Sequence, residues 1–425
     1  MSSIIELGEV RDSSSSVPPA RRPRVAGRPL RCAAVLLLAL VVLAGATPVP
    51  QRTVSVVPAL SNAHLYLVED GVFVVDPATP TGDRYLTAYA QPSPTDRGAR
   101  RRWQVPLAGM ADYLGVRAER GLVLLIGVST AGGVLQTTAL DAATGKQRWQ
   151  IPGLVEWTTD GGLLLTSGFT EGAGSVRRVA SDTGRVSWSV PVSSSGSPDY
   201  RRGANGVDQF VFVQPTGEVR VHDAGTGRLM RSVDTLPGNR SAFQQVQVVG
   251  DVLLLVSPDS TRVAAYGLPG LDPRWTAEVP LLAYATDCAG LLCLINQNGG
   301  FQVLDRATGV VRWSDPDHTL MDIRHDRLLV LGPGQRYAVR DAATGQLRND
   351  LGQWDLAPVP RRDDPLIGMR PGADGRMLVA ELDLAAGRPR TLDVLPGVAG
   401  SCQAAPPVLL CRRLDGSTAL WRLRR

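Results

Sequence analysis

Hydrophobic and polar positions alternate along most of the chain in short runs that end in turn-forming residues. Residues 135–140 and 301–304 are two such runs, and the alternation predicts strands that each bury one face. Asp, Thr and Gly follow both runs. The Asp and Thr side chains can accept backbone hydrogen bonds, and Gly tolerates the positive φ of a chain reversal. No long helical period occurs after residue 50, so the pattern predicts an all-β protein built from hairpins.

One phrase in these turns is repeated. Residues 141–149 read Asp-Ala-Ala-Thr-Gly-Lys-Gln-Arg-Trp, and residues 305–313 and 341–349 are close copies, the last without Trp. Weaker copies include residues 182–188, 223–227, 270–275 and 383–387. The turn glycines are spaced by 36 to 43 residues, at Gly145, Gly184, Gly227, Gly270, Gly309, Gly345 and Gly387. This spacing is typical of one propeller blade, which takes about 40 residues.

With Ala139 before it, the phrase resembles the tryptophan-docking motif A-x-D-x-x-T-G-x-x-x-W of the pyrroloquinoline-quinone-like propeller repeat proteins. The resemblance covers roughly residues 60–425 and implies four-stranded blades. A Trp four residues after the turn glycine can fill the gap between neighbouring sheets while its N–H finds a carbonyl. Arg231, Asn349 and Thr391 stand where other copies have Trp, so we expect those blades to dock less tightly or by another contact. We assign structural docking roles to Asp141, Thr144, Gly145, Trp149, Asp182, Gly184, Trp188, Asp223, Gly227, Trp275, Asp305, Thr308, Gly309, Trp313, Asp341 and Gly345.

The blade count depends on the first hairpin. Nine runs qualify as the third strand of a blade, but residues 65–105 could merge two of them, so we predict eight blades, with seven and nine as the alternatives. The strand-like segments at residues 408–411 and 419–423 have no outer partner after them. Residues 51–57 could supply that partner, and the two chain ends would then close the ring and remove its free edges.

The first fifty residues have a different character. Residues 1–31 are rich in Ser, Pro and Arg and are predicted to be a disordered cytoplasmic tail. Residues 32–50 carry no charge and follow five arginines, which favours a single transmembrane anchor with residues 51–425 as an extracytoplasmic propeller. This anchor would make the chain a single-pass protein of the cell membrane. The apolar run is short for a spanning helix, and cleavage near Ala46 with secretion is the alternative.

Charge separates these regions further. The chain is +5 overall, and residues 1–50 contribute +3 of this with six arginines and three acidic residues. Residues 51–425 therefore hold 39 basic and 37 acidic residues. Such an even balance gives no electrostatic footprint for a nucleic acid partner.

Four cysteines outside the anchor fall into two close pairs, Cys288 with Cys293 and Cys402 with Cys411. Each pair flanks a predicted turn between adjacent strands. An even number of cysteines in an exported domain favours two local disulfides, whereas buried free thiols would suit a cytoplasmic protein.

Candidate catalytic chemistry is sparse. The chain lacks a phosphate-binding loop, the Gly-x-Ser-x-Gly motif and metal-binding His or Cys motifs. His318 and His325 flank Asp322, but their odd spacing in a strand places them on opposite faces; His64 and His222 are isolated. The quinone-dependent dehydrogenases that share the repeat use adjacent cysteines, a catalytic Asp and calcium, and no adjacent cysteine pair occurs here. We predict no catalytic residues, no metal ligands and no cofactor.

These observations favour a membrane-tethered extracytoplasmic propeller that binds a protein, a peptide or an envelope component. The pyrroloquinoline-quinone-like propeller family, which this chain resembles, includes scaffolding proteins that assist envelope assembly. Two alternatives stay open: a quinone-dependent oxidoreductase, and a sensor that signals through the anchor to a cytoplasmic partner of residues 4–10.

Overall fold

The chain divides into two units, Met1–Arg52 and Thr53–Arg425. The computed structural model describes residues 54–68, 71–81, 83–91, 98–107, 110–130, 133–168, 173–193, 197–234 and 245–423. The predicted tail and anchor at residues 1–50 lie outside these residues. Within the described ranges, no helix has the length and apolar character needed to cross a membrane.

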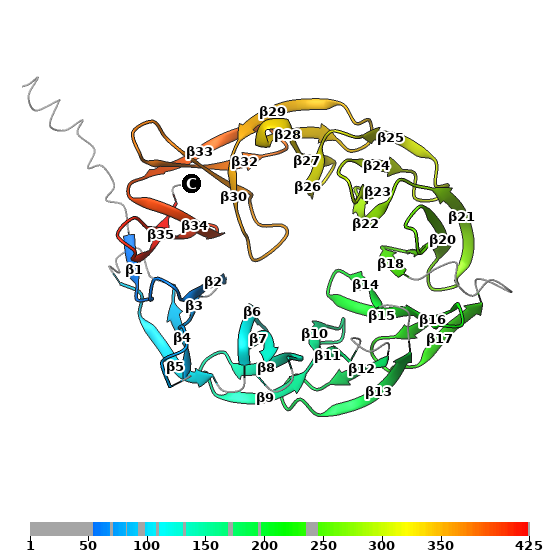
Figure 1. Cartoon of the computed structure of the whole chain (residues 1–425), viewed down its shortest axis with the longest axis horizontal. Coiled ribbons are helices and arrows are strands. Elements are labelled where there is room, and N and C mark those ends of the chain that lie inside the picture. The colour runs from blue at the N-terminus through cyan, green and yellow to red at the C-terminus, as the bar shows by residue number, and fades with distance from the viewer. Residues whose placement is uncertain are drawn as a thin grey trace, which may run out of the picture. The chain divides into compact units, whose positions relative to one another are not determined.

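The described strands form nine four-stranded antiparallel sheets, arranged as the blades of a ring (Figure 1). Blades 1 to 3 contain β2 (His64–Val68), β3 (Gly71–Val75), β4 (Arg84–Ala90) and β5 (Arg101–Leu107); β6 (Met110–Glu119), β7 (Leu122–Ser129), β8 (Leu135–Asp141) and β9 (Gln147–Pro152); β10 (Leu154–Trp157), β11 (Leu163–Ser167), β12 (Ala173–Val179) and β13 (Val186–Ser193).

Blades 4 to 6 contain β14 (Asp199–Gly203), β15 (Gly206–Val213), β16 (Glu218–Asp223) and β17 (Leu229–Asp234); β18 (Gln245–Val249), β19 (Val252–Val256), β20 (Arg262–Gly267) and β21 (Asp272–Glu278); β22 (Leu282–Cys288), β23 (Leu291–Asn296), β24 (Phe301–Leu304) and β25 (Val311–Asp315).

Blades 7 to 9 contain β26 (Thr319–Arg324), β27 (Arg327–Gly332), β28 (Arg336–Asp341) and β29 (Leu347–Gln353); β30 (Asp355–Ala357), β31 (Ile367–Pro371), β32 (Met377–Asp383) and β33 (Arg388–Leu395); β34 (Val398–Ala405), β35 (Val408–Arg413), β36 (Thr418–Arg422) and β1 (Val54–Val57). A short 3-10 helix, Pro333–Gln335, connects β27 and β28.

The favoured count of eight blades was wrong and the alternative of nine is correct, because the described strands form nine sheets. The first hairpin does not merge with its neighbour: β2 to β5 form a complete sheet before β6 begins a second one. Trp103 on β5 docks onto the next blade in the same manner as the later tryptophans, so blade 1 has the same boundary contact as the repeats that follow.

The ends of the described chain close the ring, as expected. In blade 9, β1 supplies the outermost strand and pairs with β36, with Val54 opposite Trp421 and Val57 opposite Thr418. Trp421 is 2% exposed. Closure therefore joins residues that are far apart in sequence and completes blade 9 with a fourth strand.

The hydrophobic core lies between the blades. All five residues of β19 are buried, because this second strand of blade 5 is covered on both faces by its neighbours. This arrangement explains why many middle strands are continuously apolar, as expected of strands buried on both faces. Accessible side chains are consequently found on innermost strands, outermost strands and loops.

Candidate functional site

The Asp residues of the repeated turns are engaged in local hydrogen bonds. Oδ1 of Asp141 accepts from the N–H groups of Ala143 (3.1 Å) and Thr144 (2.9 Å) and from the Thr144 hydroxyl (2.9 Å). Its Oδ2 pairs with Arg148 Nη2 at 2.5 Å. The Arg148 hydrogen bond and those of Thr144 lower the pKa of Asp141 to about 2. A carboxylate held in this state is a poor general base near neutral pH.

The same arrangement occurs in two further turns. Asp305 binds the backbone and hydroxyl of Thr308, and Asp341 binds those of Thr344. Arg312 and Arg348 lower the pKa of the respective carboxyls to about 2. Asp223 accepts from the backbone N–H and the hydroxyl of Thr226. These carboxylates organise turns rather than an active site.

Each motif tryptophan contacts the turn of the following blade. Trp149 Nε1 donates to Ser181 O at 2.8 Å, and a Cβ placed on Gly184 would lie 2.7 Å from the Trp149 ring. The remaining indole N–H groups donate to carbonyls in the same way, Trp188 to Gly225, Trp275 to Arg306 and Trp313 to Ala342.

Trp103 is a docking residue that was absent from our predicted set. Its Nε1 donates to Ala142 O at 3.0 Å, and its ring packs on Gly145. The turn before Trp103 lacks the repeated phrase, so the phrase did not reveal it. The tripeptide Arg102-Trp103-Gln104 repeats Arg148-Trp149-Gln150, and that local match is the signal that identifies it.

Blade 5 uses a different docking contact. Leu271, with φ of 60°, occupies the turn position that glycine takes elsewhere, and its N–H donates to Gly267 O at 2.7 Å. Gly270, which we assigned to that position, lies one residue earlier. An indole stacked here would meet the Leu271 side chain. Arg231 stands where other blades have the tryptophan, and its Nε donates to Gly270 O at 3.1 Å.

Two other copies also depart from the pattern. In blade 3, Ala180 rather than Asp182 takes the position of Asp141, because Gly184 N–H donates to Ala180 O. The assignment of Asp182 to that role was therefore wrong, and its carboxylate accepts from the Thr183 hydroxyl at 3.3 Å. In blade 8, Asn349 lies against Gly387 where a tryptophan packs elsewhere.

The four cysteines form two disulfides, Cys288–Cys293 and Cys402–Cys411. The first joins β22 to β23 and the second joins β34 to β35, so each links neighbouring strands of one blade. All four residues are buried. This outcome confirms both predicted pairs.

The histidines are dispersed. His318 Nδ1 lies 2.9 Å from Asp315 Oδ1, whose other oxygen pairs with Arg340 Nε at 2.6 Å. Asp322 pairs with Arg324, and His325 sits in the adjoining turn. The structure thus does not bring His318, Asp322 and His325 together. Within the described part of the chain, no three His, Cys, Asp or Glu side chains are grouped to hold a metal ion.

His222 is buried beside aromatic rings. Its ring centroid lies 4.9 Å from that of Phe210 and 5.5 Å from that of Phe212. Its Nδ1 is 2.9 Å from Gly227 O. Burial lowers the pKa of His222, and the residue acts as a packed aromatic in blade 4.

Side chains connect the innermost strands of neighbouring blades. Asp199 accepts from Val248 N–H at 2.6 Å, and Gln247 accepts from Ala285 N–H at 2.5 Å. These contacts link blades 4, 5 and 6 next to a hollow of about 710 Å³, which the exposed side chain of Tyr284 also lines.

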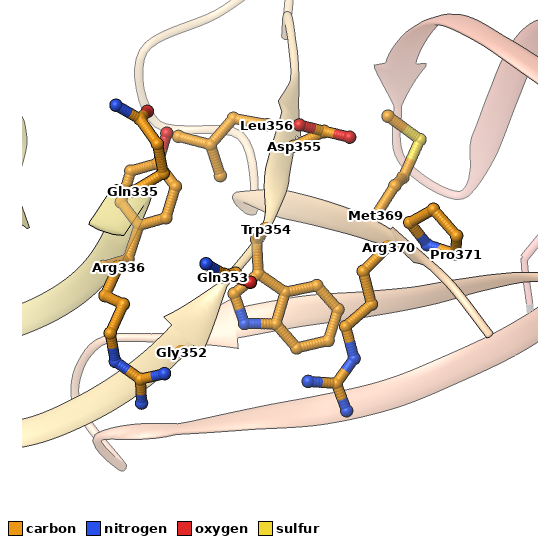
Figure 2. Close-up of a pocket in the computed structure, with 11 residues that line it drawn as sticks. Gln335, Arg336, Gly352, Gln353, Trp354, Asp355, Leu356, Met369, Arg370 and Pro371 are labelled. Carbon is orange, nitrogen blue, oxygen red and sulfur yellow. The ribbon is translucent and has the colours of Figure 1, made fainter. Parts of the chain in front are cut away.

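A second hollow, here called the blade 7–8 groove, has a volume of about 700 Å³. It lies where the chain passes from β29 to β30. Figure 2 shows Trp354 between two arginines in this groove. The lining residues are Gln335, Arg336, Tyr337, Gly352, Gln353, Trp354, Asp355, Leu356, Met369, Arg370 and Pro371.

Residues 85–315, more than half of the chain, match a family model described as "Outer membrane protein assembly factor BamB". The chain belongs to this family. The expected pyrroloquinoline-quinone-like propeller is thereby confirmed. No curated protein sequence matches the chain.

Solved structures similar to this BamB-like chain include BamB from Moraxella catarrhalis, with 14% identity, 87% of this chain and 97% of that chain covered, and a TM-score of 0.41. A europium-containing methanol dehydrogenase has 11% identity, covers 77% of this chain and 84% of its own, and gives a TM-score of 0.48. The computationally designed Ika8 protein has 17% identity, with 74% and 98% covered and a TM-score of 0.45.

Proposed function

We propose that this BamB-like chain is a protein-binding scaffold, held on the extracytoplasmic side of the cell membrane by residues 32–50. The observation that supports it is a set of exposed apolar side chains on innermost strands of different blades. Leu114 on β6 is 57% exposed, Tyr284 on β22 is 47% exposed and Met321 on β26 is 43% exposed. Aromatic residues and Met are enriched where proteins bind one another.

Hydrogen bonds between blades support the strands beside Tyr284. The inter-blade hydrogen bonds of Asp199 and Gln247 hold β18 and β22 beside Tyr284. A partner would then meet a surface that is already ordered, so binding loses little conformational entropy on this side.

The two disulfides support the proposed location. Structural disulfides persist in oxidising compartments outside the cytoplasm. The pairs Cys288–Cys293 and Cys402–Cys411 are both buried within blades, as suits a structural role.

Site-specific photo-crosslinking in cells tests the proposal. A photoreactive amino acid replaces Tyr284 in one variant and Met321 in another. A third variant carries it at Leu347, which is 57% exposed on the outermost strand β29 and serves as the control. We expect one discrete protein adduct from each innermost position and none from Leu347. Equal adducts at all three positions, or none at either innermost position, would contradict the proposal.

Analysis of the purified protein separates the scaffold from the quinone-dependent oxidoreductase. Quinone is measured by absorbance and calcium by elemental analysis. A scaffold is expected to hold far less than one equivalent of each. A full equivalent of either would favour the oxidoreductase.

A further inference from the structure

The blade 7–8 groove lies beside an unusually short inner strand. β30 has three residues, which pair with Met369, Gly368 and Ile367 of β31. β31 continues through Arg370 and Pro371 beyond that paired segment. Arg370 and Pro371 are exposed at this end of the strand.

Trp354 forms a fixed wall of the groove. Its Nε1 donates to Leu351 O at 2.7 Å, and the side of its ring is close to Gly368, where a Cβ would lie 3.0 Å from it. The residue is only 6% exposed. This burial and the hydrogen bond to Leu351 O set the position of the indole ring.

Arg370 stacks on this wall. Its Cζ lies 4.7 Å from the centre of the Trp354 ring, which is a cation–π geometry. Among the described residues, no hydrogen bond or ion pair engages the guanidinium of Arg370. Stacking occupies one flat face and leaves the N–H groups along the edge available to an acceptor.

Arg120 shows how such a group is otherwise satisfied. It stacks on Trp157 at the same 4.7 Å, but its Nη2 donates to Asn205 O and its Nε pairs with Glu119. Arg370 has the same stacking without these acceptors. Its edge N–H groups are exposed and are open to an acceptor from another molecule.

Arg336 and Asp355 set the polarity of the groove. The Arg336 guanidinium is held by Asp350, with Nη2–Oδ2 and Nε–Oδ2 distances of 2.6 and 3.1 Å. In Figure 2 the guanidinium groups of Arg336 and Arg370 extend to one side of the groove, and the Asp355 carboxylate lies toward the other. Because the charge of Asp350 offsets that of Arg336, Arg370 provides the unbalanced positive charge at this end of the groove.

We propose that the blade 7–8 groove binds an extended peptide through a carboxylate that accepts hydrogen bonds from the edge of Arg370. Planar guanidinium groups match carboxylates in a bidentate geometry. Apolar side chains of the peptide would pack on the half-buried Leu356. The inference rests on the proposed protein-binding function and specifies one contact of it.

The shape of the surface favours an extended chain. An adjoining hollow of about 400 Å³ shares Asp355, Leu356 and Met369 with the groove and continues to Gly400–Gln403 of β34. The two hollows together follow both sides of β30. A peptide several residues long can use both, whereas a small anion would contact the Arg370 end alone.

Fluorescence anisotropy with the full-length protein in detergent tests this inference. Three labelled octapeptides of Ala and Leu are compared: one with a free carboxyl terminus, one amidated, and one amidated with a single internal Glu. We expect the free-terminus or the Glu peptide to bind at least roughly tenfold more tightly than the amidated one, as charged hydrogen bonds imply. The better binder identifies the source of the carboxylate.

Substitutions assign the binding to Arg370. Arg370→Gln should weaken binding of the carboxylate peptide roughly 10- to 100-fold. Arg370→Lys retains the positive charge but not the planar guanidinium that can bind a carboxylate through two hydrogen bonds, and it should give an intermediate affinity. Arg362→Gln removes one exposed arginine from the β30–β31 loop, outside the groove, and should leave the affinity unchanged. Melting temperatures of all variants establish that they are folded.

Several outcomes would overturn the inference. These are equal binding of the three peptides, no peptide binding at millimolar concentration, and wild-type affinity in Arg370→Gln. Binding of soluble cell-wall glycan fragments that Arg370→Gln abolishes, without peptide binding, would also overturn it. Photo-crosslinking at position 284 distinguishes failure of this inference from failure of the scaffold proposal. An adduct that forms in the Arg370→Gln background leaves the scaffold proposal intact. Absence of the adduct with an unchanged Arg370 contradicts the scaffold proposal.

Discussion

Trp313 of blade 6 lies against Gly345 of blade 7, where its Nε1 donates to Ala342 O at 3.0 Å and a Cβ on Gly345 would lie 2.6 Å from its ring. The glycine is thus required twice, for a φ of 72° and for the approach of the indole. This pairing of a tryptophan with the next turn connects one blade to the following one through the first seven blades, with Arg231 the exception at blade 4.

The tryptophan contacts are expected to stabilise the ring. Trp149 is 6% exposed, so Trp149→Ala should lower the free energy of unfolding by roughly 3 to 5 kcal/mol, as for other large buried aromatics. Tyr284→Ala, at an exposed aromatic, should change it by less than about 0.5 kcal/mol. Urea denaturation measures both. A Trp149→Ala protein that unfolds at the wild-type midpoint would contradict the docking role.

Gly145 provides a test that separates close contact from backbone strain. Gly145 and Gly375 have nearly equal φ values, 74° and 72°. A Cβ on Gly145 would lie 2.6 Å from the Trp103 ring, whereas a Cβ on Gly375 would meet nothing within 4 Å. Gly145→Ala should therefore lower the melting temperature more than Gly375→Ala. Equal losses would show that φ alone, not docking, requires the glycine.

Acid should weaken the repeated turns. The pKa values of Asp141, Asp305 and Asp341 are lowered to about 2 from the ordinary 3.8, chiefly by the arginine that each carboxylate binds. A lowered pKa in the folded state contributes stability that is present above about pH 4 and is lost as the pH falls toward 2. The melting temperature of the wild-type protein should fall across this pH range. The melting temperature of Asp341→Asn should fall less steeply. Parallel curves would contradict the linkage.

Ring closure can be tested within β1. Val57 is 1% exposed and Val56 is 43% exposed, because adjacent side chains of this strand point to opposite faces. Val57→Ala should cost roughly 1.5 to 3 kcal/mol of unfolding free energy, and Val56→Ala should cost little. Deleting residues 51–57 should cost more than either, since β36 would lose its outer partner. A deletion variant that melts normally would show that β1 is an appendage.

Membrane attachment is a separate prediction about residues 32–50. The full-length protein should stay in the membrane pellet after alkaline carbonate extraction, and a variant without residues 32–50 should not. A protease added outside the membrane should reach the propeller but not a tag at residue 1. Recovery of wild type in the supernatant, with a new N-terminus near residue 47, would indicate the cleaved signal peptide instead.

The repeat and its turns could be predicted from the sequence, because the relevant signals are local. Asp141, Thr144 and Gly145 lie within five residues and interact with one another, so each turn can be recognised wherever it occurs. The two disulfides were also predictable, since each pair flanks one turn. The Arg-Trp-Gln match at residues 102–104 would have added Trp103 by the same local reasoning.

The blade number, the docking at Leu271 and the blade 7–8 groove could be established only from the three-dimensional packing of the strands. The first hairpin forms its own blade because β2 to β5 pair with one another, a choice among strands that all have similar alternation. Arg231 contacts Gly270 across 39 residues, and the packing of Trp354 on Gly368 and Arg370 depends on where β30 crosses to β31. Such contacts join segments that lie far apart in the sequence, and no local pattern shows that these segments meet. The free energy of docking depends on complementary shape rather than on local propensity.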